Sequence, residues 1–150
     1  MSPSLPEIGP MSRDEVATLV DWAAAEGWNP GLHDVDVALT VDPDAFVAVR
    51  ASGEFAGGGS IISHGGEFGF MGLFIVREDL RHAGLGRALW HHRRDLLASR
   101  LRAGATIGMD GVFDLEPFYA RGGFVRAHRD LRFEGRAAGA ADPDVVDLAT

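Results

Sequence analysis

Residues 46–76 leave few architectures open to this chain, because they form three apolar runs separated by turns that contain glycine. The runs read FVAVR, FAGGGSIISH and EFGFMGLFIV, and the turns are Ser52-Gly53-Glu54 and Gly65-Gly66. Such runs predict an antiparallel meander of three strands. The glycines 57–59 lie inside the middle run, where they indicate a bulge or a close backbone approach.

Helical patterns lie on both sides of the meander. Ser12 and Glu15 form a capping-box pattern, and the apolar spacing behind them predicts a helix over residues 13–26 that Gly27 ends. Residues 34–40 form a weaker helical stretch. After the meander we expect, in chain order, a helix over 85–101, a strand over 106–109, a short helix over 115–120 and a last strand or hairpin over 124–133.

This order of elements predicts one α/β domain with a mixed sheet. A chain of 150 residues suits a single globular domain with a real core. Residues 135–150 are small, polar and interrupted by proline, which indicates a flexible C-terminal tail or linker.

The composition excludes several kinds of chemistry. Cysteine is absent, which rules out disulfides, thiolate metal sites and cysteine nucleophiles. Lysine is absent too, so a P-loop of the GxxxxGK[ST] type cannot exist. The net charge of −8 disfavours nucleic acid or an anionic membrane as a partner and favours a cationic small molecule or peptide. The start of the chain lacks a signal pattern, and no segment is apolar over about 18 residues, so we expect a cytoplasmic protein.

The stretch VREDLRHAGLGRAL, residues 76–89, joins the last strand of the meander to the next helix. A helix that begins at such a turn presents backbone N–H groups at the positive end of its dipole, which is an anion site. Gly84 and Gly86 allow close approach to the anion, and Arg81 and Arg87 can add charge-assisted hydrogen bonds. A dinucleotide fingerprint GxGxxG does not fit, because position 89 is leucine and several antiparallel strands precede the turn.

The pattern Arg81-x-x-Gly84-x-Gly86 resembles [QR]xxGx[GA], the signature of the GCN5-related N-acetyltransferase (GNAT) superfamily. The segment FYARGGF, from Phe118 to Phe124, is similar to the family's LYxxxGF, and the resemblance covers about residues 8–134. EGWNPG and MDG look like a bacterial branch, in which some members continue into a second domain. The resemblance implies a domain over 1–134 with a mixed, mostly antiparallel central sheet of six or seven strands flanked by about four helices.

The family resemblance also implies the reaction: transfer of an acetyl group from acetyl-CoA to a primary amine of a small molecule or peptide, with no metal. The segment Phe74, Ile75 and Val76 is expected to bind the carbonyl oxygen through a backbone N–H and the pantetheine arm like an added strand. The coenzyme A pyrophosphate is expected in the turn formed by Arg81, His82, Ala83, Gly84, Leu85, Gly86 and Arg87.

An amine can attack the thioester only after it loses a proton, and a free alkylamine has a pKa of about 10.4, so a general base is needed. The family's frequent glutamate is missing from the strand between Gly69 and Phe74. Glu67 and Asp110 are the nearest carboxylates, with His64 behind them. Each also fits a solvated turn or cap residue, and the choice stays open.

Tyr119 is the only tyrosine and occupies the family's tyrosine position. A phenol with a pKa of about 10 can protonate a leaving thiolate whose reference pKa is about 8.5. Val112 replaces a frequent family asparagine, which weakens the expected coenzyme contacts. Without cysteine no thioester forms on the enzyme, so we expect direct attack in a ternary complex. Trp28 and Asn29 are candidates to line the acceptor pocket.

Two interpretations remain beside these. His91 and His92, next to Arg93 and Arg94, fit a solvated helix face better than a ligand role. Because the strand before the turn lacks the family's frequent glutamate, a non-catalytic acyl-CoA-binding regulatory domain of the same fold stays an alternative. The sequence does not determine the oligomeric state, and a homodimer is one of the alternatives.

Overall fold

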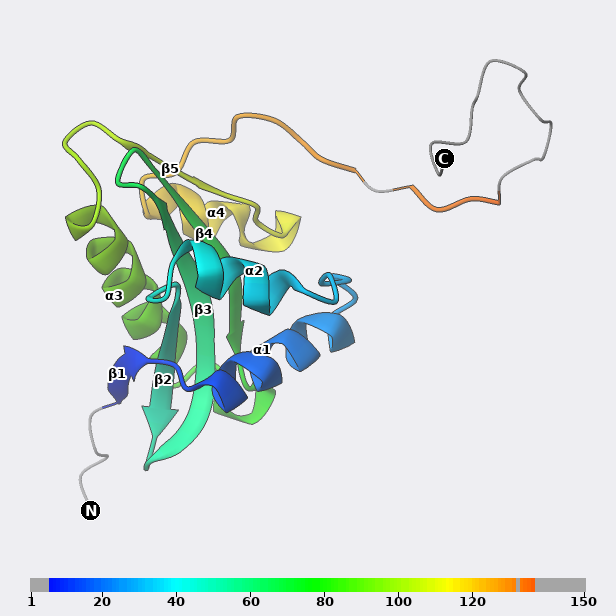
Figure 1. The fold of residues 1–150 in the computed structure, drawn as a ribbon. Helices are drawn as coiled ribbons and strands as arrows, with labels where there is room; N and C mark the ends of the chain where they lie inside the picture. Colours follow the sequence, from blue (N-terminus) through cyan, green and yellow to red (C-terminus); the bar gives the residue numbers. More distant parts are fainter. Residues whose placement is uncertain (1–5, 132, 137–150) are drawn as a thin grey trace, which may run out of the picture. The chain divides into compact units, whose positions relative to one another are not determined.

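The computed structural model describes residues 6–131 and 133–136, and the chain divides into two compact units between Val112 and Phe113. The first unit contains a sheet and three of the four α-helices (Figure 1), and the second contains the short helix α4, Glu116–Arg121. Most of the tail expected over 135–150 lies outside the described residues, which end at 136.

The sheet has five strands in the order β1-β2-β3-β4-β5. Strands β1 to β4 pair antiparallel, and β5 pairs parallel to β4, so the predicted mixed and mostly antiparallel sheet is confirmed. The predicted meander corresponds to β2, β3 and β4. The bounds are β1 Glu7–Pro10, β2 Phe46–Ala51, β3 Glu54–His64, β4 Phe68–Val76 and β5 Thr106–Met109.

The expected count of six or seven strands is wrong for the described part of the chain, which holds five. The strand expected over 124–133 does not form in residues 124–131 or at 133. Its apolar side chains have no buried face to line, since Val125 is 90% exposed and Phe133 is 86% exposed. A strand also needs a neighbour for its backbone groups, and apolar alternation alone does not provide one.

The helices follow their sequence signals. The capping box of Ser12 and Glu15 is present in full at the start of α1, Arg13–Ala25, and Gly27 ends it with a positive φ of 78°. The other long helices are α2, Asp34–Val41, and α3, Leu85–Ser99, while short 3₁₀ turns occupy η1, Glu78–Leu80, and η2, Phe113–Leu115. No helix in the described residues is long and apolar enough to cross a membrane.

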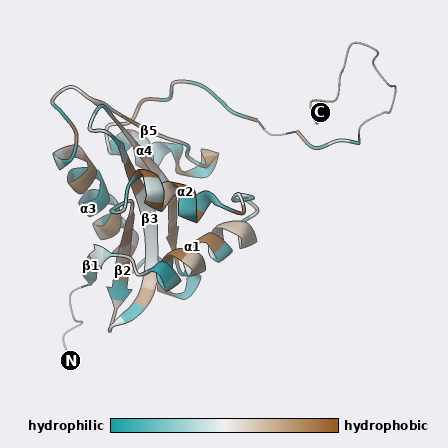
Figure 2. Cartoon of the chain, viewed as in Figure 1, coloured by the Kyte–Doolittle hydropathy of each residue, from teal (hydrophilic) through white to brown (hydrophobic). Residues whose placement is uncertain are grey.

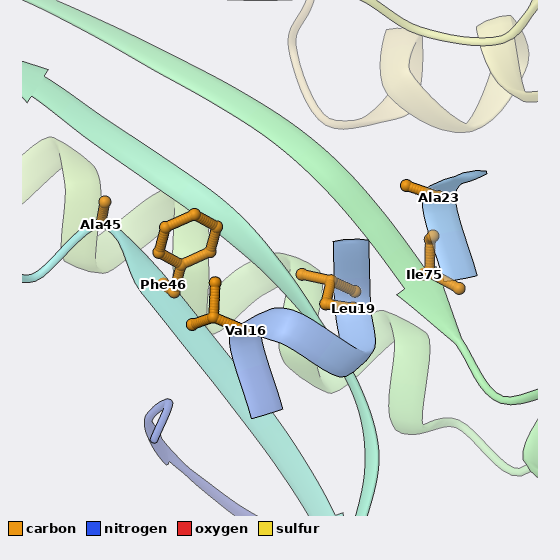
Figure 3. Packing of buried hydrophobic residues seen from close by; sticks show 6 residues of the cluster. All are labelled: Val16, Leu19, Ala23, Ala45, Phe46 and Ile75. Carbon is orange, nitrogen blue, oxygen red and sulfur yellow. The ribbon is translucent and has the colours of Figure 1, made fainter. Parts of the chain in front are cut away.

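Helices α1 and α2 cover one face of the sheet, and α3 covers the opposite face (Figure 1). Adjacent glycines of β3 show this, because a Cβ on Gly58 would meet Met11 before α1, whereas a Cβ on Gly59 would meet Arg93 of α3. Figure 2 shows the apolar residues concentrated along the strands between these helices. The core on the α1 face is shown in Figure 3 and consists of Val16, Leu19, Ala23, Ala45, Phe46 and Ile75.

The exposed face of α3 contains His91 and His92, as predicted. Arg93, beside them, is instead fully buried against the sheet. It belongs to a buried stripe with a spacing of four residues, made of Leu85, Leu89, Arg93 and Leu97.

Candidate functional site

Strands β4 and β5, which pair in parallel, stop pairing in the middle of β4. Strand β5 pairs only with the first four residues of β4, and the last pair is Met71 with Met109. From Gly72 to Val76, β4 continues with β3 as its paired neighbour. The described residues therefore leave one backbone edge of β4 without a strand partner over these five positions.

A bulge lies where the strands part. On the β3 side Ser60 pairs with Gly72 and Gly58 pairs with Ile75, so Leu73 and Phe74 together face Gly59. Leu73 has a φ of 45°, a left-handed conformation that is rare for leucine and costs about 1–3 kcal/mol. The bulge predicted from the glycine run is confirmed, but its extra residue belongs to β4.

The extra residue reverses which face each side chain of β4 occupies. Before the bulge, a Cβ on Gly69 would contact Leu97 of α3 and Leu101 just after that helix. After it, Phe74 faces α3, with its ring centroid 5.9 Å from that of Trp90. Ile75 is in the core against α1, and Leu73 packs against the same core.

The turn after β4 presents backbone N–H groups at the start of α3. His82 and Gly84 have positive φ angles of 66° and 85°, and Gly84 is the N-cap of α3. No side chain of the described residues caps this helix end by a hydrogen bond. Leu85 is buried and anchors the turn, whereas Ala83 and Arg87 are exposed. Such a turn can bind an anion through main-chain N–H groups alone.

Arg81 is turned back toward the end of β4. Its Nε donates to the carbonyl oxygen of Val76 at 2.9 Å, and its Nη2 lies 3.3 Å from Oε1 of Glu26 at the end of α1. The side chain is about half exposed, so a bound anion can compete with Glu26 for it. Gly86 lies where a Cβ would be 3.6 Å from both Phe74 and Val76, so α3 begins in direct contact with the end of β4.

The two candidate carboxylates lie at different places along β4, Glu67 before its start and Asp110 beside its middle. Glu67 precedes the strand and pairs with Arg102 at 2.5 Å, roughly 20 Å along the chain from Phe74. His64 is at the same end, with its ring 5.8 Å from that of Phe68. Asp110 directly follows Met109, the last residue that pairs with β4, and is exposed. Of the three, only Asp110 is next to the point where the strands part.

The acceptor candidates follow α1. The N–H of Trp28 donates to the Ala23 carbonyl at 3.0 Å, and its side chain packs half-buried against the core that also contacts Leu73. Asn29 is exposed and has a φ of 51°. Trp22 stacks on Phe55 with ring centroids 5.1 Å apart, and both pack against the same core on the α1 face.

Tyr119 lies on α4 in the second unit. It is half-buried, and its ring meets that of Phe118 edge-on at 5.7 Å. The carbonyl oxygen of Tyr119 accepts hydrogen bonds from the N–H groups of Gly122 at 2.9 Å and Phe124 at 3.2 Å. The FYARGGF segment therefore contains the end of α4 and the hydrogen-bonded turn that follows it.

Sequence reasoning missed two residues of this site, Leu73 and Arg93. The position of Arg93 could have been found, because it occurs in register with leucines four residues before and after it, which is the spacing of a buried stripe. Leu73 gave no signal, since nothing in a leucine indicates a left-handed backbone.

Comparison with known proteins identifies the family of the chain. A model of the family described as "Acetyltransferase (GNAT) domain" matches residues 11–138. Holothin acyltransferase from a Pseudoalteromonas species is 28% identical over 126 residues, and the match covers 84% of this chain. The chain spans only 41% of that relative's length.

Solved structures show the same fold at low identity. A protein of Xanthomonas campestris described as belonging to the GNAT family superposes with a TM-score of 0.67 at 15% identity, over 89% of this chain and 96% of that one. N-acetylglutamate synthase from Neisseria gonorrhoeae, solved with coenzyme A, gives a TM-score of 0.60 at 16% identity, over 79% of this chain and 28% of that one. The chain therefore belongs to the GNAT acetyltransferase domains, a family of acyl-CoA-dependent acyltransferases.

Proposed function

We propose that the chain transfers an acetyl group from acetyl-CoA to a primary amine of a small molecule or peptide, directly and in a ternary complex. One observation carries this proposal. The strand that stops pairing with β5 after Met71 continues through a bulge, and a turn that includes η1 joins it to the uncapped start of α3. An open strand edge and an anion site are thus consecutive along the chain, as a cofactor with an amide-containing arm and a diphosphate requires.

Coenzyme A would bind along this path. The diphosphate accepts hydrogen bonds from the N–H groups around Gly84 and Gly86, with Arg87 and a released Arg81 adding charge. The pantetheine arm lies against the β4 edge as an added strand, over the segment Phe74 to Val76. The thioester then reaches the bulge.

The carbonyl oxygen of the thioester needs a fixed donor. The Gly72 carbonyl oxygen is 2.8 Å from Nη2 of Arg93, on the side of β3 and α3. The C=O and N–H of a trans peptide point in opposite directions, so the Leu73 N–H points away from β3, toward the open edge. We therefore propose Leu73 as the donor, one residue before the expected segment. A fixed donor of this kind contributes about 2.7–4 kcal/mol to transition-state stabilisation.

The transfer replaces the C–S bond of the thioester by the C–N bond of an amide. The amine nitrogen attacks the thioester carbon, a C–N bond forms, the C–S bond breaks, and the electron pair leaves on sulfur. The amine proton goes to a base, for which Asp110 is the better placed carboxylate, directly or through water. The thiolate takes a proton from an acid, for which the family resemblance nominates Tyr119.

The acceptor is proposed as an amine with an apolar or aromatic portion, because Trp28, Trp22 and Phe55 are partly buried aromatic side chains on the core that Leu73 also contacts. The net charge of −8 favours a cationic acceptor on encounter. The relative's name adds holothin to the acceptors that should be tried first.

Calorimetry tests the cofactor, and thiol detection tests the activity. We expect acetyl-CoA to give a heat of binding where ATP and NAD give none. We expect thiol release when the bound protein receives an amine from a panel of holothin, polyamines, aminoglycosides, amino acids and peptide amino termini. Binding without thiol release for any amine would favour the regulatory alternative, and no heat with acetyl-CoA would refute both.

A further inference from the structure

Arg93 is a buried cation directly beneath the β4 bulge. Its side chain is 0% exposed, and its Nη2 donates to the carbonyl oxygens of Ser60 at 2.5 Å and Gly72 at 2.8 Å. These two residues are the last regular pair of β3 and β4 before the bulge. The guanidinium therefore binds the main chain where the ladder is interrupted.

The surrounding residues make room for this guanidinium. A Cβ on Gly59 would lie 2.5 Å from Nη1 and 2.7 Å from Nη2, so position 59 accepts no larger residue while Arg93 stays in place. The Phe74 ring covers the other side, with its centroid 5.3 Å from Cζ of Arg93. Burying a guanidinium is costly. A leucine or methionine would fill the stripe without that cost, so the charge of Arg93 calls for a role beyond packing.

The task follows from the peptide that Arg93 holds. The bond between Gly72 and Leu73 is trans, so a hydrogen bond that fixes the Gly72 carbonyl also fixes the direction of the Leu73 N–H. That direction is away from β3, and β5 has stopped pairing at Met71. A hydrogen bond to the carbonyl also polarises the peptide and strengthens its N–H as a donor, by about 10–30%.

We propose that Arg93 is a positioning residue for acyl transfer: it holds the Gly72 carbonyl so that the Leu73 N–H faces the thioester carbonyl oxygen before negative charge develops there. This inference rests on the proposed function and adds a residue to it. Arg93 touches neither the substrate nor the reacting atoms, and it acts through one peptide group.

The first test replaces Arg93 by methionine, which keeps the length and the apolar stem but removes the donors. We expect kcat to fall by on the order of 10²-fold, as when an oxyanion donor is lost. The KM for acetyl-CoA and the Kd for coenzyme A stay near wild type, because the turn around Gly84 is untouched. Arg94→Met is the matched control, since Arg94 is next on the helix, is 34% exposed and pairs with Asp95. We expect it to keep wild-type kcat.

A second readout needs no acceptor. The protein is given acetyl-CoA labelled with carbon-13 at the thioester carbonyl, and the carbonyl stretch is measured by difference infrared spectroscopy. We expect the wild-type band below that of free acetyl-CoA, because the oxygen accepts a hydrogen bond. In Arg93→Met the band returns toward the free value, and in Arg93→Lys it lies between the two.

Gly59→Ala is the independent variant. It leaves the charge in the chain but crowds the guanidinium, so it should lower kcat and shift the band in the same direction as Arg93→Met. The inference is overturned if the wild-type band is not displaced, or if Arg93→Met folds, binds acetyl-CoA and keeps the wild-type kcat and band. In the latter case acetyl transfer itself still stands. Failure of the wild-type protein to bind acetyl-CoA would instead refute the proposed function.

Discussion

At the scale of single residues, the candidate site is mostly main chain. The proposed donors are the N–H of Leu73 and the N–H groups at the start of α3, and three residues with positive φ orient them: Leu73, His82 and Gly84. Side chains act mainly by fixing peptide groups, as Arg93 does for Gly72 and as Arg81 does for Val76. Substitutions that disturb the backbone should therefore harm function more than changes to exposed side chains.

Gly84→Glu should abolish coenzyme A binding while leaving the protein folded. The carboxylate would repel the diphosphate, and the side chain would occupy the space proposed for the diphosphate. Calorimetry with coenzyme A measures the effect. Gly104→Glu is the matched control, because Gly104 has a φ of 80° against 85° for Gly84, and both positions have open space beyond the backbone. Equal loss of binding in both variants would mean that backbone strain, not the anion site, is responsible.

Tyr119→Phe should bind acetyl-CoA normally and turn over more slowly. The loss of the phenol removes the proposed proton donor for the thiolate, and we expect a fall in kcat of about 10²-fold, the low end for general acid catalysis. Steady-state kinetics with the best acceptor of the panel measures it, with the unfolding midpoint as the check on stability. An unchanged kcat would contradict the role that the resemblance implies.

At the scale of elements, local periodicity was enough for much of the fold. The capping box at Ser12 and the apolar spacing behind it predicted α1, and the turns between the apolar runs predicted β2 to β4. These signals are local, so they survive in any tertiary context. Strand β1 was missed because Glu7–Pro10 is four residues long, contains glycine and proline, and is a strand through its pairing with β2.

The candidate site was harder to predict than the fold. The turn 81–87 was visible, since glycine and arginine at a strand-to-helix junction suggest an anion. The glycine run 57–59 indicated a bulge, but it did not show that the extra residue lies in β4, because the register of one strand against another is a tertiary property that sets the φ of Leu73. The choice between Glu67 and Asp110 also needed the pairing of β4 with β5.

The start of α1 should weaken in acid. Burial alone would raise the pKa of Glu15, but hydrogen bonds from Arg50 and the Ser12 N–H outweigh it, so the pKa lies below the ordinary value. A lowered folded-state pKa contributes stability above the unfolded pKa of about 4.3, and that stability is lost as the pH falls through the folded value. Glu15→Gln should therefore be less stable than wild type at pH 7, by roughly 1 kcal/mol, with the difference vanishing in acid.

Denaturant unfolding between pH 7 and pH 3 measures this difference. Asp36→Asn is the control, because Asp36 pairs with Arg13 while both side chains are more than half exposed, and it should change stability by a few tenths of a kcal/mol at most. A Glu15→Gln deficit that is independent of pH would show that the charge of Glu15 does not support the fold.

At the scale of the whole molecule, the excess of 22 acidic over 14 basic residues should steer acceptors electrostatically. We expect kcat/KM for a diamine to fall more steeply with salt than that for a monoamine of equal chain length. The reason is that screening shortens the reach of the protein's field, to about 3 Å at 1 M salt. Parallel salt curves for the two amines would show that net charge does not select the acceptor.

Helix α3 begins at the turn proposed to bind the diphosphate and contains Arg93 about two turns later, so one rigid element spans both ends of the proposed cofactor path. With a rise of 1.5 Å per residue, Gly86 and Arg93 are about 10.5 Å apart along the axis. In the proposed complex, the helix would fix the distance between the diphosphate and the thioester. One residue inserted between Arg87 and Arg93 would rotate the guanidinium by about 100° away from Gly72 and leave the phosphate turn intact. Such a variant should still bind coenzyme A, but Arg93 would no longer orient the Leu73 N–H.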